Sequence, residues 1–172
     1  MEKNKILQCI NEIKNHETLN NELKDLLIDL LDLRKNKYHP LVFINGTPTI
    51  GKNVSIGFFS EINAKEGKVV IGNNCDIASF VSINVADSHL KAIGMKNIIK
   101  RGEIVLGDNV FVGSHSFICG NVKIGSNSVV AAGTILIDSE NIPPYSLVKG
   151  NPAIIYKGHY LSMKQRNSNL SR

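Results

Sequence analysis

The chain has 172 residues, of which 42% are hydrophobic but only 6% aromatic, and its formal net charge is +5. This length predicts one ordinary domain with a small appendage. No apolar run approaches the about 18 residues of a membrane span, and the charged first turns are not typical of a secretory signal. We therefore expect no membrane span. Three widely spaced cysteines favour a reducing, cytoplasmic compartment over a disulfide framework or a zinc site.

The positive charge is concentrated at the C-terminus. Residues 154–172 contain four basic residues and no acidic ones, whereas basic and acidic residues are nearly balanced elsewhere. A nucleic-acid-binding domain concentrates its basic residues on a folded surface. We therefore expect no nucleic-acid partner and interpret residues 154–172 as a solvated C-terminal tail.

Residues 1–40 are predicted to form an N-terminal helical segment. Leucines recur at spacings of four and three from Leu19 to Leu33, and an earlier apolar stripe runs from Ile6 to Ile13. The polar stretch NHETLNN separates the two stripes. We therefore predict two helices, at roughly 3–14 and 19–34, whose apolar faces either cover an end of the main domain or mediate assembly.

A six-residue repeat dominates residues 41–153. Ile, Val or Leu recurs at every sixth position in three runs. These positions are Ile50, Ile56, Ile62, Ile71, Ile77, Ile83, Leu106, Val112, Ile118, Ile124, Val130, Leu136, Ile142 and Val148. The second position of the hexad is mostly Gly or Ala, and the fourth is mostly Asn or Gly, which tolerate a left-handed backbone.

This pattern predicts an all-β solenoid, a left-handed parallel β-helix. Each hexad supplies a short strand and a corner, three hexads form a triangular coil, and coils stack about 4.8 Å apart. The handedness is an exception to the right-handed crossover rule. An antiparallel sandwich would need alternating apolar residues and hairpin turns, which the sequence lacks.

Two asparagines interrupt the repeat where Gly or Ala is expected. Asn63 and Asn84 are 21 residues apart, which equals one coil plus a three-residue insertion in AKEGKVV. We therefore expect them to stack at one corner of consecutive coils. Such a polar ledge suits either an asparagine ladder that satisfies turn backbone or contact with a substrate.

A longer interruption, at residues 85–105, predicts a loop extruded from the β-helix. Long loops on rigid scaffolds tend to carry function. This one begins with Asp87-Ser88-His89, and an imidazole suits general-base chemistry near neutral pH. His89 is therefore the candidate base, whereas His115, at a turn position, is expected to have a structural or cofactor-lining role.

The same stretches resemble the hexapeptide-repeat acetyltransferases. The resemblance covers residues 45–157 and is carried by IGKNVSIG, VVIGNNCDI, IVLGDNVFVGSHSFI, NVKIGSNSVVAAGTIL and IPPYSLVKGNPA, which look like the sugar acetyltransferase branch. It implies acetyl-CoA as co-substrate, no metal, and a homotrimer with each site between two adjacent β-helices. It also implies that a loop from one subunit closes over its neighbour.

The resemblance also implies an acceptor and the residues that contact it. The loop and the ending are most similar to enzymes of surface-polysaccharide assembly, which favours the amino group of a nucleotide-linked amino sugar, with a sugar hydroxyl as the alternative. His89 matches the catalytic histidine, which would take the acceptor's proton. Asn63 matches an asparagine near the acceptor, and Asn84 and Asp87 are expected to contact the substrate beside it.

The cofactor groove is expected in residues 113–157. Ser114 matches a serine beside the thioester arm, with Gly113 next to it, and Ala132 matches a backbone contact to the pantetheine. The lysine that contacts the CoA phosphates in the family has no counterpart after the AAG hexad. Lys149 or Lys157 is expected to replace it.

Two other classes of protein share this fold. A zinc carbonic anhydrase needs three converging histidines, whereas only His89 and His115 lie between residues 41 and 153. A non-enzymatic scaffold would need neither His89 nor the asparagine ledge. Both readings are therefore less favoured than a sugar acetyltransferase.

Overall fold

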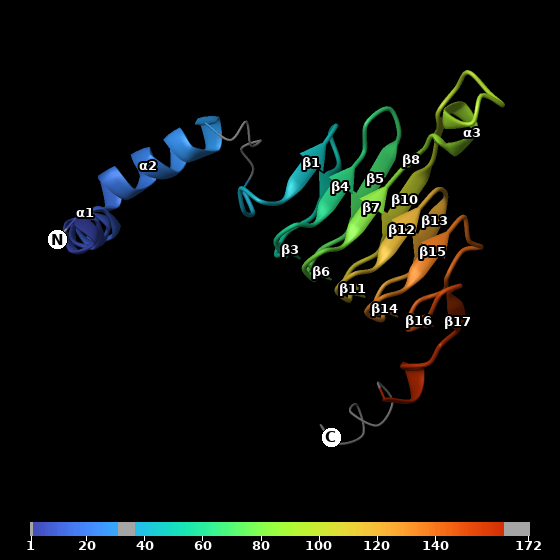
Figure 1. Ribbon diagram of the computed structural model, residues 1–172. Helices are drawn as coiled ribbons and strands as arrows, with labels where there is room; N and C mark the ends of the chain where they lie inside the picture. Colours follow the sequence, from blue (N-terminus) through green and yellow to red (C-terminus); the bar gives the residue numbers. More distant parts are fainter. Residues whose placement is uncertain (1, 31–36, 164–172) are drawn as a thin grey trace, which may run out of the picture. The chain divides into compact units, whose positions relative to one another are not determined.

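The structure is a computed structural model that describes residues 2–30 and 37–163. The chain divides into two compact units, residues 1–35 and 36–172. The first contains helices α1 (Glu2–Asn15) and α2 (Glu17–Leu30) (Figure 1). None of the helices in the described ranges is long and apolar enough to cross a membrane.

The structure corrects the predicted helix boundaries. The break falls at His16 alone rather than across NHETLNN. The ring Nδ1 of His16 accepts a hydrogen bond from the Leu19 backbone N–H at 3.4 Å, so this side chain caps the start of α2. The predicted end of the second helix, at residues 31–34, lies outside the described residues.

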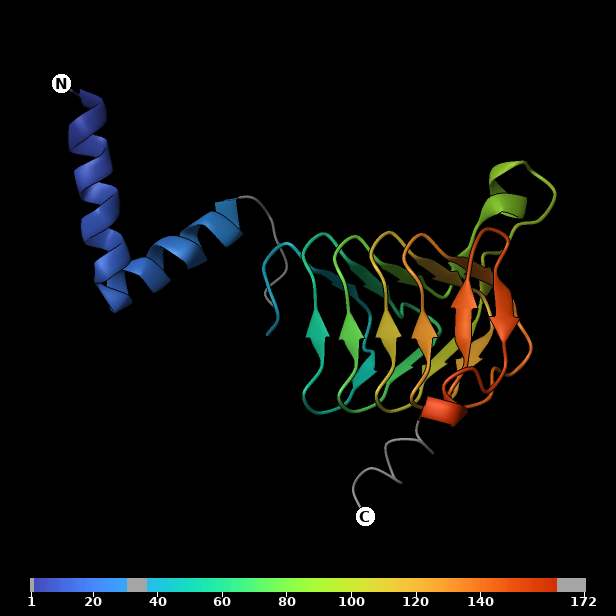
Figure 2. The same ribbon diagram turned by 90° about the horizontal axis from the view of Figure 1, so that it is seen from below.

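The second unit contains a parallel β-helix with three faces (Figure 2). Face A contains β1 (Phe43–Asn45), β4 (Glu61–Asn63), β7 (Ser82–Asn84), β12 (Phe117–Cys119) and β15 (Ile135–Ile137). Face B contains β2 (Thr49–Ile50), β5 (Lys68–Ile71), β10 (Glu103–Leu106) and β13 (Val122–Ile124). Face C contains β3 (Ser55–Ile56), β6 (Asp76–Ile77), β11 (Phe111–Val112), β14 (Val129–Val130), β16 (Leu147–Lys149) and β17 (Ile154–Tyr156). The predicted left-handed β-helix is confirmed.

The predicted aliphatic positions form the core. Ile62, Ile83 and Ile118 lie opposite one another on β4, β7 and β12, and each is fully buried. All 14 predicted positions are buried except Ile50, which packs against the core while partly exposed. The repeat has a period of six because each face of the coil points one of these side chains inward and the next face begins six residues later.

The corners explain the other regular positions. A Cβ at Gly57 would lie 2.5 Å from the backbone nitrogen of Ser79 on the next coil, so no side chain fits there. The residues that turn the B–C corner have positive φ: Asn53, Asn74, Asn109, Asn127 and, in the last coil, Tyr145. One prediction fails, because Gly120 (φ 80°) rather than Asn121 is left-handed in its hexad.

The extruded loop is shorter than predicted. The chain leaves the β-helix after Val85 and returns at Gly102, whose N–H donates to the Val85 carbonyl at 2.8 Å. β8 (Ala86–Asp87) and β9 (Lys100–Arg101) pair as antiparallel strands, and α3 (His89–Ala92) lies beyond them. Residues 103–105 belong to β10, which pairs with β5, so the loop is residues 86–101 rather than 85–105.

The C-terminal tail also begins later than predicted. β17 reverses direction and pairs antiparallel with β16. Ala153 and Ile155 pack against the last core residues, so this segment covers the end of the apolar column. Residues 154–156 are therefore part of the fold, and residues 164–172 lie outside the described residues.

Candidate active site

His89 and Asp87 form the centre of the candidate site. Asp87 ends β8 and His89 begins α3, so both lie at the root of the loop. The Asp87 carboxylate contacts His89 Nδ1 and also accepts the His89 backbone N–H at 3.1 Å. These hydrogen bonds hold the pKa of Asp87 below its usual value. A neutral imidazole that donates from Nδ1 carries its lone pair on Nε2, which is the arrangement of a general base.

The loop root borders two hollows. One is lined by Asp87, His89, Leu90, Lys96, Ile98 and Lys100, so it lies within the loop itself. The other runs from the loop root onto face A, where Phe117, Cys119 and Ile137 line it. His89 lines both, and its side chain is 65% exposed, so it is accessible to a small-molecule acceptor.

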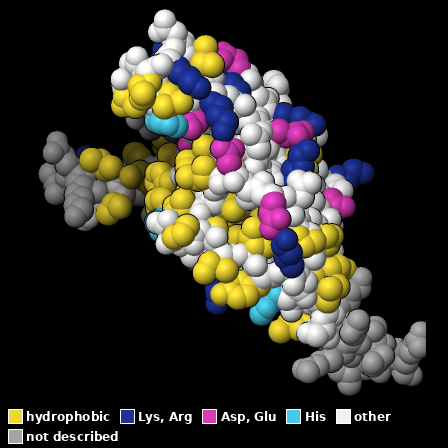
Figure 3. Space-filling model, turned by 90° about the vertical axis from the view of Figure 1, so that its right-hand side faces the viewer, with side chains coloured by type: hydrophobic (Ala, Val, Ile, Leu, Met, Phe, Trp, Pro, Cys, Tyr) yellow, Lys and Arg dark blue, Asp and Glu magenta, His cyan; other side chains and the backbone are white. Residues whose placement is uncertain are grey.

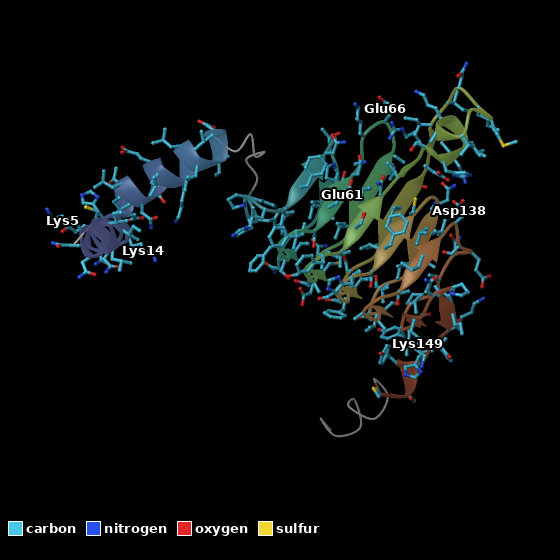
Figure 4. All side chains as sticks on the ribbon, viewed as in Figure 1. Lys5, Lys14, Glu61, Glu66, Asp138 and Lys149 are labelled. Carbon is cyan, nitrogen blue, oxygen red and sulfur yellow. The ribbon has the colours of Figure 1, made fainter. Side chains whose placement is uncertain are left out.

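Two ion pairs tie the loop base to neighbouring coils. Lys100 Nζ lies 2.6 Å from a carboxylate oxygen of Asp138. A guanidinium nitrogen of Arg101 lies 3.1 Å from a carboxylate oxygen of Glu66. Glu66 and Asp138 belong to different coils, as Figure 4 shows. The ion pair between Lys100 and Asp138 raises the pKa of the Lys100 ammonium and lowers the pKa of the Asp138 carboxyl. The root of the loop is thereby fixed, while its tip projects from the β-helix (Figure 1).

The predicted asparagine ledge is present and longer than expected. Asn63 lies opposite Asn84, and Asn45 lies opposite Asn63 on the preceding coil. Asn45 Nδ2 donates to Asn63 Oδ1 at 3.2 Å, and the Asn84 side-chain oxygen accepts the Ala86 N–H at 2.8 Å. The amide oxygens therefore hold the turn backbone at the A–B corner. On the following coil, Cys119 lies opposite Asn84, so the row of asparagines ends there.

The residues predicted to bind the cofactor gather at a different corner. Gly113, Ser114 and Ala132 lie where face C turns into face A, and the Gly133 N–H donates to the Ser114 carbonyl at 2.9 Å. A Cβ at Gly113 would lie 2.4 Å from the Ala132 nitrogen, whereas one at Gly133 would meet open space. The surface beside Ser114 is therefore open at Gly133, whereas the rings of Phe80 and His115 occupy the C–A corner of the two preceding coils.

The two predicted groups lie at opposite edges of face A. Asn63, Asn84, Asp87 and His89 are at the A–B corner, whereas Ser114 is at the C–A corner. The structure therefore brings together the residues within each group but does not join the two groups within one chain.

The two lysines expected to contact the CoA phosphates lie in different parts of the β-helix. Lys149 ends β16 near the C–A corner, and its ammonium lies 5.0 Å from the Tyr156 ring centroid (Figure 4). Lys157 instead forms a 2.8 Å ion pair with Glu140, which lies between β15 and face B. Only Lys149 therefore accompanies the predicted cofactor residues.

Sequence reasoning missed Asn45, Phe117, Cys119 and Ile137 at the site. The register could have found Asn45, which precedes Asn63 by one coil, but the loop interrupts the register between Asn84 and Cys119. Burial raises the pKa of the Cys119 thiol above its usual value. No group of three His, Cys, Asp or Glu residues suited to a metal ion occurs in the part of the chain that the structure describes.

Fold and site together define a hexapeptide-repeat protein with a histidine-bearing loop. Residues 103–138 match the family described as bacterial transferase hexapeptide (six repeats). The chain is 33% identical over 117 residues to the galactoside O-acetyltransferase of Escherichia coli (strain K12), covering 62% of this chain and 55% of that protein. The chain spans 24% and 55% of the lengths of the first two curated relatives that it matches.

Solved structures agree with this assignment. A variant of AntD, an N-acyltransferase from Bacillus cereus, matches with a TM-score of 0.61 at 20% identity, covering 77% of this chain and 75% of that chain. The polySia specific acetyltransferase NeuO matches with a TM-score of 0.52 at 28% identity, covering 67% and 60%. The first likeness shows the fold. Together with the family match, these findings confirm the resemblance to the hexapeptide-repeat acetyltransferases.

Proposed function

We propose that the protein transfers an acetyl group from acetyl-CoA to a sugar. The contact between His89 and Asp87 at an exposed loop root, beside a ledge of asparagine amides, is the observation that carries this proposal. The E. coli relative is a sugar O-acetyltransferase, and AntD was crystallised with dTDP-4-amino-4,6-dideoxyglucose and coenzyme A. The acceptor that we propose is the amino group of a nucleotide-linked amino sugar for surface-polysaccharide assembly.

The described side chains suit the steps of this reaction. His89 accepts the acceptor's proton at Nε2, while Asp87 holds the ring through Nδ1 and stabilises the imidazolium that forms. The Ser114 N–H is the proposed donor to the developing oxyanion. Acetyl-CoA supplies the thioester, and the proton held by His89 neutralises the departing thiolate. Ser114, Ala132 and Lys149 are the residues proposed to hold the co-substrate.

The site requires a second copy of the chain. The acceptor residues and the cofactor residues lie at opposite edges of face A, so a cyclic trimer with face A inward places the A–B corner of one copy beside the C–A corner of the next. The side chains exposed on faces A and B support this arrangement. Face A exposes Phe43 and Ile137, whereas face B carries Glu103 in ion pairs with two lysines.

A sugar hydroxyl is the second candidate acceptor. A hydroxyl must lose its proton as it attacks, which the His89–Asp87 contact suits, and the E. coli relative is an O-acetyltransferase. An amine has the further option of losing its proton to water at the Asn84 ledge.

Acetyl-CoA turnover against a matched panel tests the proposal. Release of free thiol is measured with nucleotide-linked amino sugars, their hydroxyl analogues, and simple galactosides and glucosides. Turnover with an amino sugar well above its hydroxyl analogue supports N-acetylation, and the reverse preference supports O-acetylation. Absence of turnover with every sugar, from protein that binds acetyl-CoA, would contradict the sugar acceptor. Light scattering at micromolar concentration should give the mass of a trimer, and a monomer would contradict the shared site.

A further inference from the structure

The hollow within the loop carries an excess of basic groups. Of its six lining residues, His89, Lys96 and Lys100 are basic and Asp87 is the single acid. The Asp87 carboxylate is already in contact with the His89 ring. Basic side chains (dark blue) lie beside a histidine (cyan) where the loop projects at the top of Figure 3. The hollow is therefore suited to an anionic group.

Hydrogen bonds within the loop place Lys96 at this hollow. The Leu90 carbonyl accepts the backbone N–H groups of Met95 at 2.9 Å and of Lys96 at 3.1 Å. Gly94 makes this reversal possible with a φ of 74°, a left-handed conformation that glycine adopts at helix ends. The chain thus folds back on α3, which begins with His89, and the Lys96 backbone is held against the first turn of that helix.

The three lysines of the loop differ in their surroundings. Lys100 is already paired with Asp138 at 2.6 Å. Across the described ranges, neither Lys91 nor Lys96 forms an ion pair with an acidic side chain. Lys91 is exposed and does not line the hollow. Lys96 is therefore the lysine that both lines the hollow and keeps its positive charge uncompensated.

The other residues predicted to contact the acceptor leave a charge unmatched. Asn63 and Asn84 offer neutral amides, and Asp87 offers a carboxylate. The proposed acceptor, a nucleotide-linked amino sugar, carries negatively charged phosphates. A phosphate near the Asp87 carboxylate is disfavoured unless a cation lies close to it, because like charges repel. Lys96 is placed to supply that cation.

We propose that Lys96 binds a phosphate group of the nucleotide-linked acceptor and so selects this acceptor over an uncharged sugar. The ammonium and phosphate groups form a charge-assisted hydrogen bond, which is stronger than a hydrogen bond between neutral groups. His89 lines the same hollow, so a sugar held by its phosphate brings its amino group within reach of the ring. This inference rests on the proposed function and names the residue that recognises the charge of the acceptor.

Titration calorimetry with uridine diphosphate and thymidine diphosphate tests the site without turnover. Saturating coenzyme A is present throughout, so that the cofactor groove is filled and cannot take up the nucleotide. We expect Lys96→Ala to raise the dissociation constant about tenfold, and Lys96→Arg to stay near wild type because it keeps the charge. Lys91→Ala is the matched control, because it removes an exposed lysine of the same loop that does not line the hollow.

Three results of this titration would overturn the proposal. They are equal affinities of wild type and Lys96→Ala, an equal loss of affinity in Lys91→Ala, and no binding by the wild type. Glucuronate is titrated in parallel, because a carboxylate could use the same ammonium group. Tighter binding of glucuronate than of both nucleotides would assign the hollow to a carboxylate and would also overturn the phosphate.

Steady-state kinetics identifies which substrate Lys96 contacts. In Lys96→Ala, the KM for a nucleotide-linked amino sugar should rise about tenfold, while kcat and the KM for acetyl-CoA change little. Added salt should raise this acceptor's KM more in the wild type than in Lys96→Ala, because salt screens the ion pair. A raised KM for acetyl-CoA instead would assign Lys96 to the CoA phosphates and overturn the proposal.

The two measurements separate this inference from the proposed function. Nucleotide binding that depends on Lys96, without acetyl transfer to any sugar, would refute the proposed function and leave this site standing. Acetyl transfer to a nucleotide-linked sugar with the same KM in wild type and Lys96→Ala would refute this site alone.

Discussion

The Asp87 carboxylate contacts His89 through the ring Nδ1 and holds it at the root of the loop. We predict that His89→Ala loses about 10²–10⁴-fold in turnover while keeping its affinity for acetyl-CoA. The base acts in the transition state, whereas the predicted cofactor residues lie at the other edge of face A. Turnover by thiol release and binding by calorimetry check this. A variant with most of its turnover would show that the proton leaves by another route.

The loop base should depend on the ion pair between Lys100 and Asp138. Lys100→Ala removes that ion pair, so we expect faster proteolytic cleavage at the exposed Lys91 and Lys96, together with reduced turnover. Lys65→Ala is a matched control, because it removes an exposed lysine from the same corner. Equal cleavage of wild type and Lys100→Ala would show that β8–β9 pairing alone holds the loop.

The buried cysteines should be dispensable for catalysis. Burial raises the pKa of both the Cys75 and the Cys119 thiol, so little reactive thiolate forms near neutral pH. We expect Cys75→Ala and Cys119→Ala to retain acetyl transfer, with circular dichroism showing an intact fold. Because Cys119 lines the hollow beside His89, a change in acceptor affinity there is compatible with this prediction, whereas complete loss of turnover is not.

Close coil stacking makes certain glycines irreplaceable. At Gly57 a Cβ would lie 2.5 Å from the Ser79 nitrogen, so Gly57→Ala must push two coils apart. We expect a loss of about 1–3 kcal/mol in the free energy of unfolding. Chemical denaturation of Gly57→Ala and of the wild type measures the difference, and equal stability of the two would contradict the prediction.

Glu103 should contribute a small acid-sensitive stabilisation. Hydrogen bonds from Lys68 and Lys123 lower its pKa to about 2. Because the folded pKa lies below the unfolded one, the contribution is present above about pH 4.3 and is lost as pH falls toward 2. Glu103→Gln should therefore melt slightly earlier than wild type at pH 6, and the two should converge near pH 2. A constant difference across that range would contradict the assignment.

The hexad made most of the fold predictable, because one inward side chain per face is a constraint that every coil repeats. Helix α2 starts two residues before the predicted position, since His16 caps it with a ring nitrogen that ordinary capping preferences do not include. Gly120 takes the left-handed turn that the repeat assigned to Asn121, and Gly46 and Asp138 do the same directly after their face A strands, because the A–B corner turns one residue earlier than the repeat predicts.

The candidate site was predictable only in part. Register alone placed Asn63 against Asn84, since both lie on uninterrupted strands. Cys119 escaped notice because the loop between β7 and β12 hides the register between them. The ion pair of Lys100 with Asp138 joins residues 38 positions apart, and no local pattern marks such a contact.

The two departures from the repeat, near residue 65 and at residues 86–101, leave the β-helix at the same corner. The hydrogen bond between Gly102 and Val85 joins the two ends of the longer departure, residues 86–101. The strands on either side of this loop therefore keep their pairing, β7 with β12 and β5 with β10. The loop is thus an interchangeable module. On the proposed function, a relative's loop of different length, grafted between Val85 and Gly102, should change the preferred acceptor while the β-helix folds as before.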